Sequence, residues 1–336
     1  MQPAYATPIA EIQCASREVP EDIYGADSPV VLRGLVADWP AVEAARTSHQ
    51  AFVSYLTSLY NGKPVNAFMA NPEAQGRIFY NAEVDGFNFI QSQVYLDDAL
   101  NKIAEIAGRE KQPTYYVGSL ETRDHLPEFA MENRLPLQAT QVREAIWLGN
   151  QSVVAPHFDF PANIACCVAG ERRFTLFSPD QSENMYIGPL DFTPAGQPIS
   201  MVDIRDPDLA QFPRFRHAMK VAQTTVLQPG DAIYVPSMWW HSVESLSPVN
   251  GLVNYWWRET PAYLGQPNQV LLHALMSIKH LPQSQRQAWQ ALFNHFVFEQ
   301  PDDMYEHLPA RSQQQQSQMT EATARKIKAL LINNLK

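Results

Sequence analysis

The chain has 336 residues, of which 45% are hydrophobic and 18% are charged, and its formal net charge is −10 at pH 7. This composition excludes an intrinsically disordered chain, and the length is enough for one large domain with an appendage. The acidic balance argues against a broad basic surface that would bind nucleic acid.

Cysteine content and the first residues of the chain predict a cytoplasmic protein. The three cysteines, Cys14, Cys166 and Cys167, imply no disulfide framework, which is typical of a reducing compartment. The N-terminal stretch lacks a basic region followed by an apolar run, so we expect no signal peptide. No uninterrupted apolar run is long enough for a membrane span, so none is expected.

Short strands alternate with a few helices along the first 260 residues. A short apolar run, 29–34, predicts the first strand, and the spacing of Phe52, Tyr55, Leu56 and Leu59 predicts a helix over 41–60. A second helix is expected over 93–107. The other strands are expected at 64–69, 77–80, 114–117, 144–148, 164–168, 173–177, 222–227, 231–235, 240–245 and 251–257.

Many short strands separated by turn signals are typical of a barrel or a double-sheet jelly roll. We therefore expect a mainly β fold with flanking helices. The region 178–217 is rich in Pro, Asp and Phe and shows little periodicity, so it is predicted to be a long insertion between strands. Loops of this length often serve as lids or binding loops.

The period becomes helical from about residue 268. Apolar residues mark helix faces near Leu271 and near Leu330, and a Gln/Ser-rich stretch, 311–318, is interpreted as a linker between helices. The chain is thus expected to divide into a mainly β domain with N-terminal elements, 1–265, and a C-terminal helical extension, 266–336. The apolar faces of that extension must be buried against the barrel or against a second copy of the chain.

A metal-binding pattern lies at Pro156-His157-Phe158-Asp159. Residues two apart in a strand face the same side, so His157 and Asp159 are placed to reach one metal ion. Iron(II) sites of the facial-triad kind combine two histidines with one carboxylate and leave positions open for other ligands. Because an isolated HxD pattern often arises by chance, a second histidine from a distant strand is needed.

His241 is the candidate for that second histidine. A Gly-Asp hairpin at 230–231 leads into a strand, and the Trp-Trp-His sequence that ends at His241 begins the next strand. The remaining histidines lie in loops or helical runs and are given structural roles. They are His49, His125, His217, His273, His280, His295 and His307.

The stretches 145–177 and 226–257 resemble the JmjC-type cupin-like (cupin 8) hydroxylases, a family that includes asparaginyl hydroxylases. The shared order is HxD, an Asn four residues after the Asp, Gly-x-basic-Arg, the GDAIYVPSMWWH motif and Asn-aromatic-Trp. This order fits across roughly residues 20–260. The resemblance implies a double-stranded β-helix, Fe(II) held by His157, Asp159 and His241, and 2-oxoglutarate as cosubstrate.

The family places a cation deep in the barrel to bind the far carboxylate of 2-oxoglutarate, usually a lysine two residues after a strand glycine. Arg172 stands at that position after Gly170, and Val154 stands where the family has a threonine. Strand alternation predicts that Arg172 enters the barrel while Arg173 faces away. By the resemblance, the same pocket is lined by Tyr116 (or Tyr115, one residue away), Asn163 and Asn254.

The resemblance implies a dioxygenase that hydroxylates its substrate, and it implies a homodimer formed through the C-terminal helices. Members of the family act on protein side chains, on methylated lysines or on a tRNA base. The acidic balance favours a protein or peptide side chain over RNA, with a small molecule as the second choice. A non-catalytic metal-binding cupin and a structural zinc cupin are the alternatives, and the intact HxD…H triad favours the enzyme.

Overall fold

The computed structural model divides into two compact units, each described here by itself. The first unit, Met1–Glu259, contains the strands that the structure describes, and the second unit, Thr260–Lys336, contains helices. None of the described helices has the length and apolar character needed to cross a membrane. The structure describes the chain apart from residues 1–4, 16, 300, 302, 318 and 336.

The larger sheet has nine strands in the order β2-β3-β13-β10-β15-β8-β7-β4-β6. Only β2 and β3 pair in parallel; the other neighbours are antiparallel. Its strands are β2 (Ala10–Gln13), β3 (Val30–Arg33), β4 (Val65–Ala70), β6 (Phe89–Val94), β7 (Thr114–Glu121), β8 (Arg143–Gly149), β10 (Ala162–Ala169), β13 (Ala232–Val235) and β15 (Asn250–Trp257).

The smaller sheet has six strands in the order β1-β12-β11-β14-β9-β5. The two edge strands, β1 and β5, pair in parallel with their neighbours, and the four central strands are antiparallel. The mainly β, two-sheet architecture expected from the sequence is confirmed. The strands are β1 (Thr7–Pro8), β5 (Arg77–Ile78), β9 (Ser152–His157), β11 (Arg172–Phe177), β12 (Gln223–Leu227) and β14 (Trp240–Ser245).

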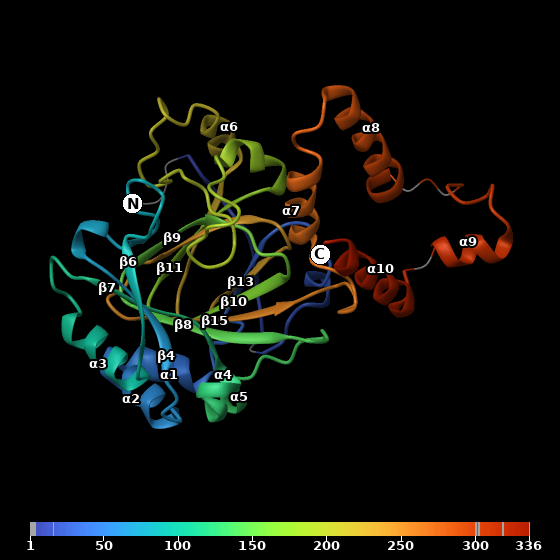
Figure 1. Ribbon diagram of the computed structural model, residues 1–336. Helices are drawn as coiled ribbons and strands as arrows, with labels where there is room; N and C mark the ends of the chain where they lie inside the picture. The colour runs from blue at the N-terminus through green and yellow to red at the C-terminus, as the bar shows by residue number, and fades with distance from the viewer. Residues whose placement is uncertain (1–4, 16, 300, 302, 318, 336) are drawn as a thin grey trace. The chain divides into compact units, whose positions relative to one another are not determined.

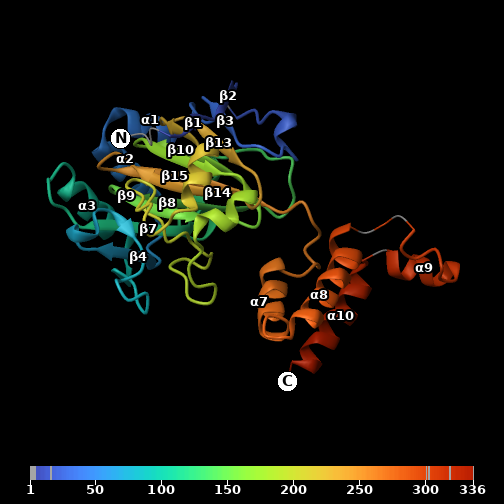
Figure 2. The same cartoon turned by 90° about the horizontal axis from the view of Figure 1, so that it is seen from above.

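Strand β10 shows how the pleat separates two cores. It lies between β13 and β15, side by side in Figure 2, and all eight of its residues are buried. Ala165 and Cys167 face the core between the sheets, whereas Ile164 and Cys166 face the core under the helices. A strand covered on both faces is apolar at successive positions, which explains its continuous hydrophobic sequence.

Helices cover the outer face of the larger sheet (Figure 1). The helix expected over 41–60 is two helices, because Ser48 leaves the helical conformation and its hydroxyl accepts a hydrogen bond from the Ala51 backbone N–H at 3.0 Å. The helices of this layer are α1 (Pro40–Thr47), α2 (His49–Leu59), α3 (Leu96–Ile106), α4 (Thr122–His125) and α5 (Pro127–Glu132).

The insertion 178–217 packs on the outer face of the smaller sheet. It contains a 3-10 helix, η3 (Pro179–Met185), and leads into α6 (Phe215–Val221). Met185 and Phe215 pack there against Trp240 of β14. The other 3-10 helices of the first unit are η1 (Glu21–Ile23) and η2 (Pro72–Ala74).

The second unit consists of helices with few buried residues. The prediction of a linker is wrong over 311–317, where α9 (Ala310–Ser317) is helical, and residue 318 lies outside the described residues. Glutamine is a good helix former, and a polar composition alone does not break a helix. The other helices are α7 (Pro267–Ser277), α8 (Gln283–Phe293), a π-helical turn η4 (Asn294–Glu299) and α10 (Glu321–Asn334).

The turn between β10 and β11 depends on Gly170, and a substitution there tests the fold. Gly170 has φ +68°, and a Cβ would lie 2.5 Å from the Val249 carbonyl oxygen. We expect Gly170→Ala to lower the free energy of unfolding by more than the roughly 1–2 kcal/mol that left-handed backbone costs a non-glycine residue. Gly25→Ala is the control, because Gly25 has φ +82° and no atom near its Cβ position. Equal losses in denaturant unfolding would contradict the steric argument.

Candidate metal centre

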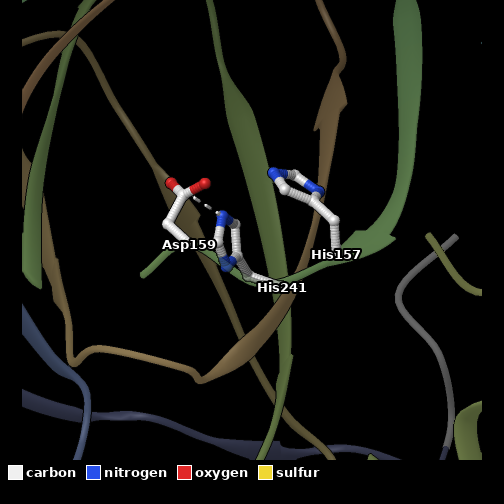
Figure 3. A group of neighbouring side chains, drawn as sticks. All are labelled: His157, Asp159 and His241. Carbon is white, nitrogen blue, oxygen red and sulfur yellow. Dashed lines mark ion pairs between the residues drawn. The ribbon is translucent and has the colours of Figure 1, made fainter. Parts of the chain in front are cut away.

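Two of the three predicted ligands face each other across neighbouring strands. His157 is the last residue of β9, His241 lies in β14, and the antiparallel register pairs them directly. Their ring centroids are 4.3 Å apart. Asp159 lies two residues beyond the end of β9, so strand geometry stops at His157, yet its carboxylate still points toward the two rings (Figure 3).

The hydrogen bonds of the two imidazoles fix which nitrogen is free. His157 Nδ1 lies 3.0 Å from the Ala155 carbonyl oxygen, and His241 Nδ1 lies 2.9 Å from the Trp239 carbonyl oxygen. A carbonyl oxygen only accepts, so Nδ1 carries the proton in both rings. The Nε2 lone pairs are therefore left for a metal ion, which is the usual arrangement of metal-binding histidines.

Burial keeps His241 neutral. Its side chain lies in the core, and removal from water together with the nearby His157 lowers its pKa to about 4. A metal ligand must be unprotonated, so at neutral pH no proton has to be displaced from His241.

Asp159 is held by two side chains from distant parts of the chain. Its Oδ2 accepts a hydrogen bond from the Trp256 indole N–H at 2.9 Å, and its Oδ1 accepts one from the Gln197 amide at 3.1 Å. The same Oδ2 lies 3.8 Å from His241 Nε2. Neither Trp256 nor Gln197 was among the site residues expected from the sequence.

The donor set fits an iron(II) ion. One ligand atom from each of His157, Asp159 and His241 lies within 4.8 Å of the others. Two imidazole nitrogens and one carboxylate oxygen form the 2-His-1-carboxylate set of non-haem iron(II) oxygenases, which binds on one face of the ion.

Arg172 lies deeper in the same core, in agreement with the alternation argument. It shares its strand face with Phe174 and Leu176, which pack between the two sheets. It is 1% exposed, and among the described residues it forms no ion pair with a carboxylate. Its Nη2 donates to the Trp147 carbonyl oxygen at 3.4 Å, whereas its Nε has no hydrogen-bond partner.

Tyr116, rather than Tyr115, lies beside this guanidinium. The Tyr116 hydroxyl interacts with Arg172, and its ring stacks on Trp147 with centroids 5.7 Å apart. Burial raises the pKa of Tyr116 to about 12, so the phenol is protonated and can donate. Tyr115 packs against the core under the helices, on the other face of β7.

The two predicted asparagines lie together on the inner face of β10 and β15. The Asn254 amide donates to Asn163 Oδ1 at 3.0 Å, and both side chains are buried. Asn254 Oδ1 has no partner among the described residues. An unpartnered buried oxygen has a cost in free energy, so a donor on a bound molecule would offset that cost.

Comparison with known proteins places this geometry in context. The family model described as "Cupin-like domain" matches residues 16–263 of this chain. The human HSPB1-associated protein 1 is 26% identical over 277 residues, which cover 76% of this chain and 53% of that protein. The Danio rerio lysine-specific demethylase 8 is 25% identical over 258 residues, 74% of this chain and 58% of its own. This chain thus spans little more than half the length of these two curated relatives.

Replacement of one ligand tests the centre. Because His241 supplies one of three donors, we expect His241→Ala to weaken Co(II) binding by more than about 100-fold, the upper end of what loss of an outer-shell partner costs. The measurement is a titration followed by the visible absorption of Co(II). His217→Ala, on the exposed face of α6, is the control. Unchanged affinity in His241→Ala would contradict the assignment.

Proposed function

The chain belongs to the JmjC-type cupin-like family, and we propose that it is an Fe(II)- and 2-oxoglutarate-dependent dioxygenase that hydroxylates a protein or peptide side chain. The observation that carries this proposal is the buried Arg172, which lies in the same core as His157, Asp159 and His241 and pairs with no carboxylate among the described residues. A metal-binding cupin without a cosubstrate has no use for such a cation.

In this proposal His157, Asp159 and His241 hold Fe(II), which when bound supplies the activation of oxygen. The chain's own part is to place three ligands on one face and to keep them oriented. The Ala155 and Trp239 carbonyl groups fix the imidazole tautomers. Preorganised groups of this kind lower the cost of reaching the reactive geometry.

Arg172 and Tyr116 are proposed to bind the far carboxylate of 2-oxoglutarate. A buried guanidinium without a counter-ion is costly, so the site favours an anion. Arginine presents a planar fork that pairs with a carboxylate through two parallel hydrogen bonds, and Tyr116 adds a neutral donor. Arg172 stands four residues along β11 from the partner of His241, about 13 Å at 3.3 Å per residue, and its long side chain shortens that separation.

The substrate class rests on charge and on relatives. The net charge of −10 argues against RNA, and one relative is named a lysine-specific demethylase, an enzyme of amino-acid side chains. A protein or peptide side chain is therefore proposed first and a small molecule second. The three cysteines are free thiols, which agrees with the proposed cytoplasmic location.

The cosubstrate proposal is tested by anaerobic titration with Fe(II) and 2-oxoglutarate, read from the visible charge-transfer band of the complex. We expect Arg172→Met to raise the dissociation constant of 2-oxoglutarate at least tenfold, equivalent to about 1.4 kcal/mol. Arg172→Lys, which restores a cation, should recover part of that loss.

Arg173→Lys is the matched control, because Arg173 faces away and pairs with Glu244 at 2.7 Å. If Arg172 and Arg173 variants both bind 2-oxoglutarate like the unchanged chain, the cation lies elsewhere or the cosubstrate is a different molecule. A chain that binds Fe(II) but gives no band with 2-oxoglutarate would instead support the non-catalytic metal-binding cupin.

We also propose that the second unit forms a homodimer interface. Among its described residues only Met304 and Ala324 are buried hydrophobic side chains, so its helices do not bury their apolar faces within the unit. Many exposed apolar side chains on the helices of one unit indicate an interaction site. The exposed residues include Val270, Leu271, Leu272, Met276, Trp289, Leu292, Phe296, Val297, Phe298, Ile327, Leu330, Leu331, Ile332 and Leu335.

Light scattering of the intact chain decides the dimer proposal. We expect twice the monomer mass, and we expect the double substitution Leu271→Glu/Leu330→Glu to return the monomer, because charges at an apolar interface are costly to bury. Gln287→Glu, an exposed polar position on α8, should leave the dimer intact. A monomeric unchanged chain would refute the proposal.

A further inference from the structure

A short piece of the insertion runs along the end of β9. Ile199 forms an antiparallel bridge with His157, and the Ser200 backbone N–H donates to the Pro156 carbonyl oxygen at 2.7 Å. The piece is fixed from its other side, since Ser200 bridges Ile187 and Met201 N–H donates to the Tyr186 carbonyl oxygen at 3.0 Å. Backbone pairing therefore holds the segment 197–200 next to the ligands at the end of β9, His157 and Asp159.

The register of this bridge, continued two residues past the end of β9, brings Gln197 opposite Asp159. In an antiparallel pair, a residue two positions beyond one partner faces the residue two positions before the other, on the same side. Asp159 follows His157 by two residues and Gln197 precedes Ile199 by two. Their side chains meet accordingly, with Gln197 Nε2 donating to Asp159 Oδ1 at 3.1 Å.

The two carboxylate oxygens of Asp159 therefore accept hydrogen bonds from different side chains. Oδ2 is the oxygen near His241 Nε2 and accepts the Trp256 indole N–H, whereas Oδ1 is turned to Gln197. A carboxylate whose two oxygens have separate donors cannot rotate without losing a hydrogen bond. Hydrogen-bond partners of metal ligands orient them in this way and tune metal affinity.

We infer that Gln197 is a positioning residue that holds the Asp159 carboxylate with one oxygen toward the two histidines. This inference rests on the proposed metal centre. It gives the insertion a specific role: the segment 197–200 completes the centre, so the centre forms fully only when this segment is paired with the end of β9. The Trp256 indole N–H holds the other oxygen, Oδ2, in the same way.

The test is Co(II) binding by the full chain carrying Gln197→Met, which keeps the unbranched length and removes the N–H donor. We expect about a tenfold rise in the Co(II) dissociation constant and an altered visible Co(II) spectrum, because Asp159 gains freedom to turn. The melting temperature of the metal-free protein should be unchanged, because Gln197 is only partly buried. Gln211→Met, at an exposed position of the same insertion, is the matched control and should bind Co(II) normally.

The outcomes separate the two proposals. Unchanged affinity and spectrum in Gln197→Met overturn the positioning role and leave the metal centre standing. Loss of Co(II) together with an equal loss of thermal stability also overturns it, since a structural role then explains both. If the unchanged chain takes up no Co(II), or His241→Ala takes it up equally well, the metal centre itself is wrong and this inference falls with it.

Discussion

The hydrogen-bond register between β9 and β14 is the constraint on which the site depends. It sets His157 opposite His241, and a register shift separates this pair from the regular ladder that joins Ser152–Val154 to Val243–Ser245. Because side chains alternate from face to face, a slip of one residue would turn one histidine out of the core. The chemistry of the centre therefore depends on the pairing of these two strands and on the position of the register shift between them.

The same alternation places two neighbouring arginines, Arg172 and Arg173, on opposite faces of β11. Arg173 lies on the outer face of β11 and is neutralised by Glu244, whereas Arg172 lies on the inner face and has neutral partners among the residues that the structure describes. Burial lowers the pKa of Arg172, which reflects the cost of keeping this charge from water. A fold that held Arg172 only for stability would do better with an apolar residue of similar size. The position of this cation is thus an argument for a bound anion.

The sequence allowed the parts of the fold that carry a local pattern to be predicted. Apolar runs located β10 and β11, and the alternation argument put Arg172 on the correct face. Strand β6 was not predicted, because its polar sequence, FIQSQV, leads directly into α3 and its end was interpreted as part of that helix. A single cap residue, Ser48, divided the helix expected over 41–60.

The partners of Asp159 could not be predicted for a different reason. Trp256 and Gln197 reach Asp159 from positions far away in the sequence, through sheet pairing and a two-residue bridge. Neither contact leaves a periodic signal. Trp256 could have been suspected, since it alternates with Asn254 toward the core between the sheets, but nothing in the insertion's composition singles out Gln197.

Cys167 faces the core between the sheets, and this position affects how readily its sulfur is oxidised. Burial raises the pKa of its thiol to about 12, so the sulfur keeps its proton throughout the physiological range. Oxidants and electrophiles attack the thiolate far faster than the thiol. A cysteine enclosed in this core is therefore unreactive. In a protein that works with iron and oxygen, this position would resist oxidation to sulfenic acid.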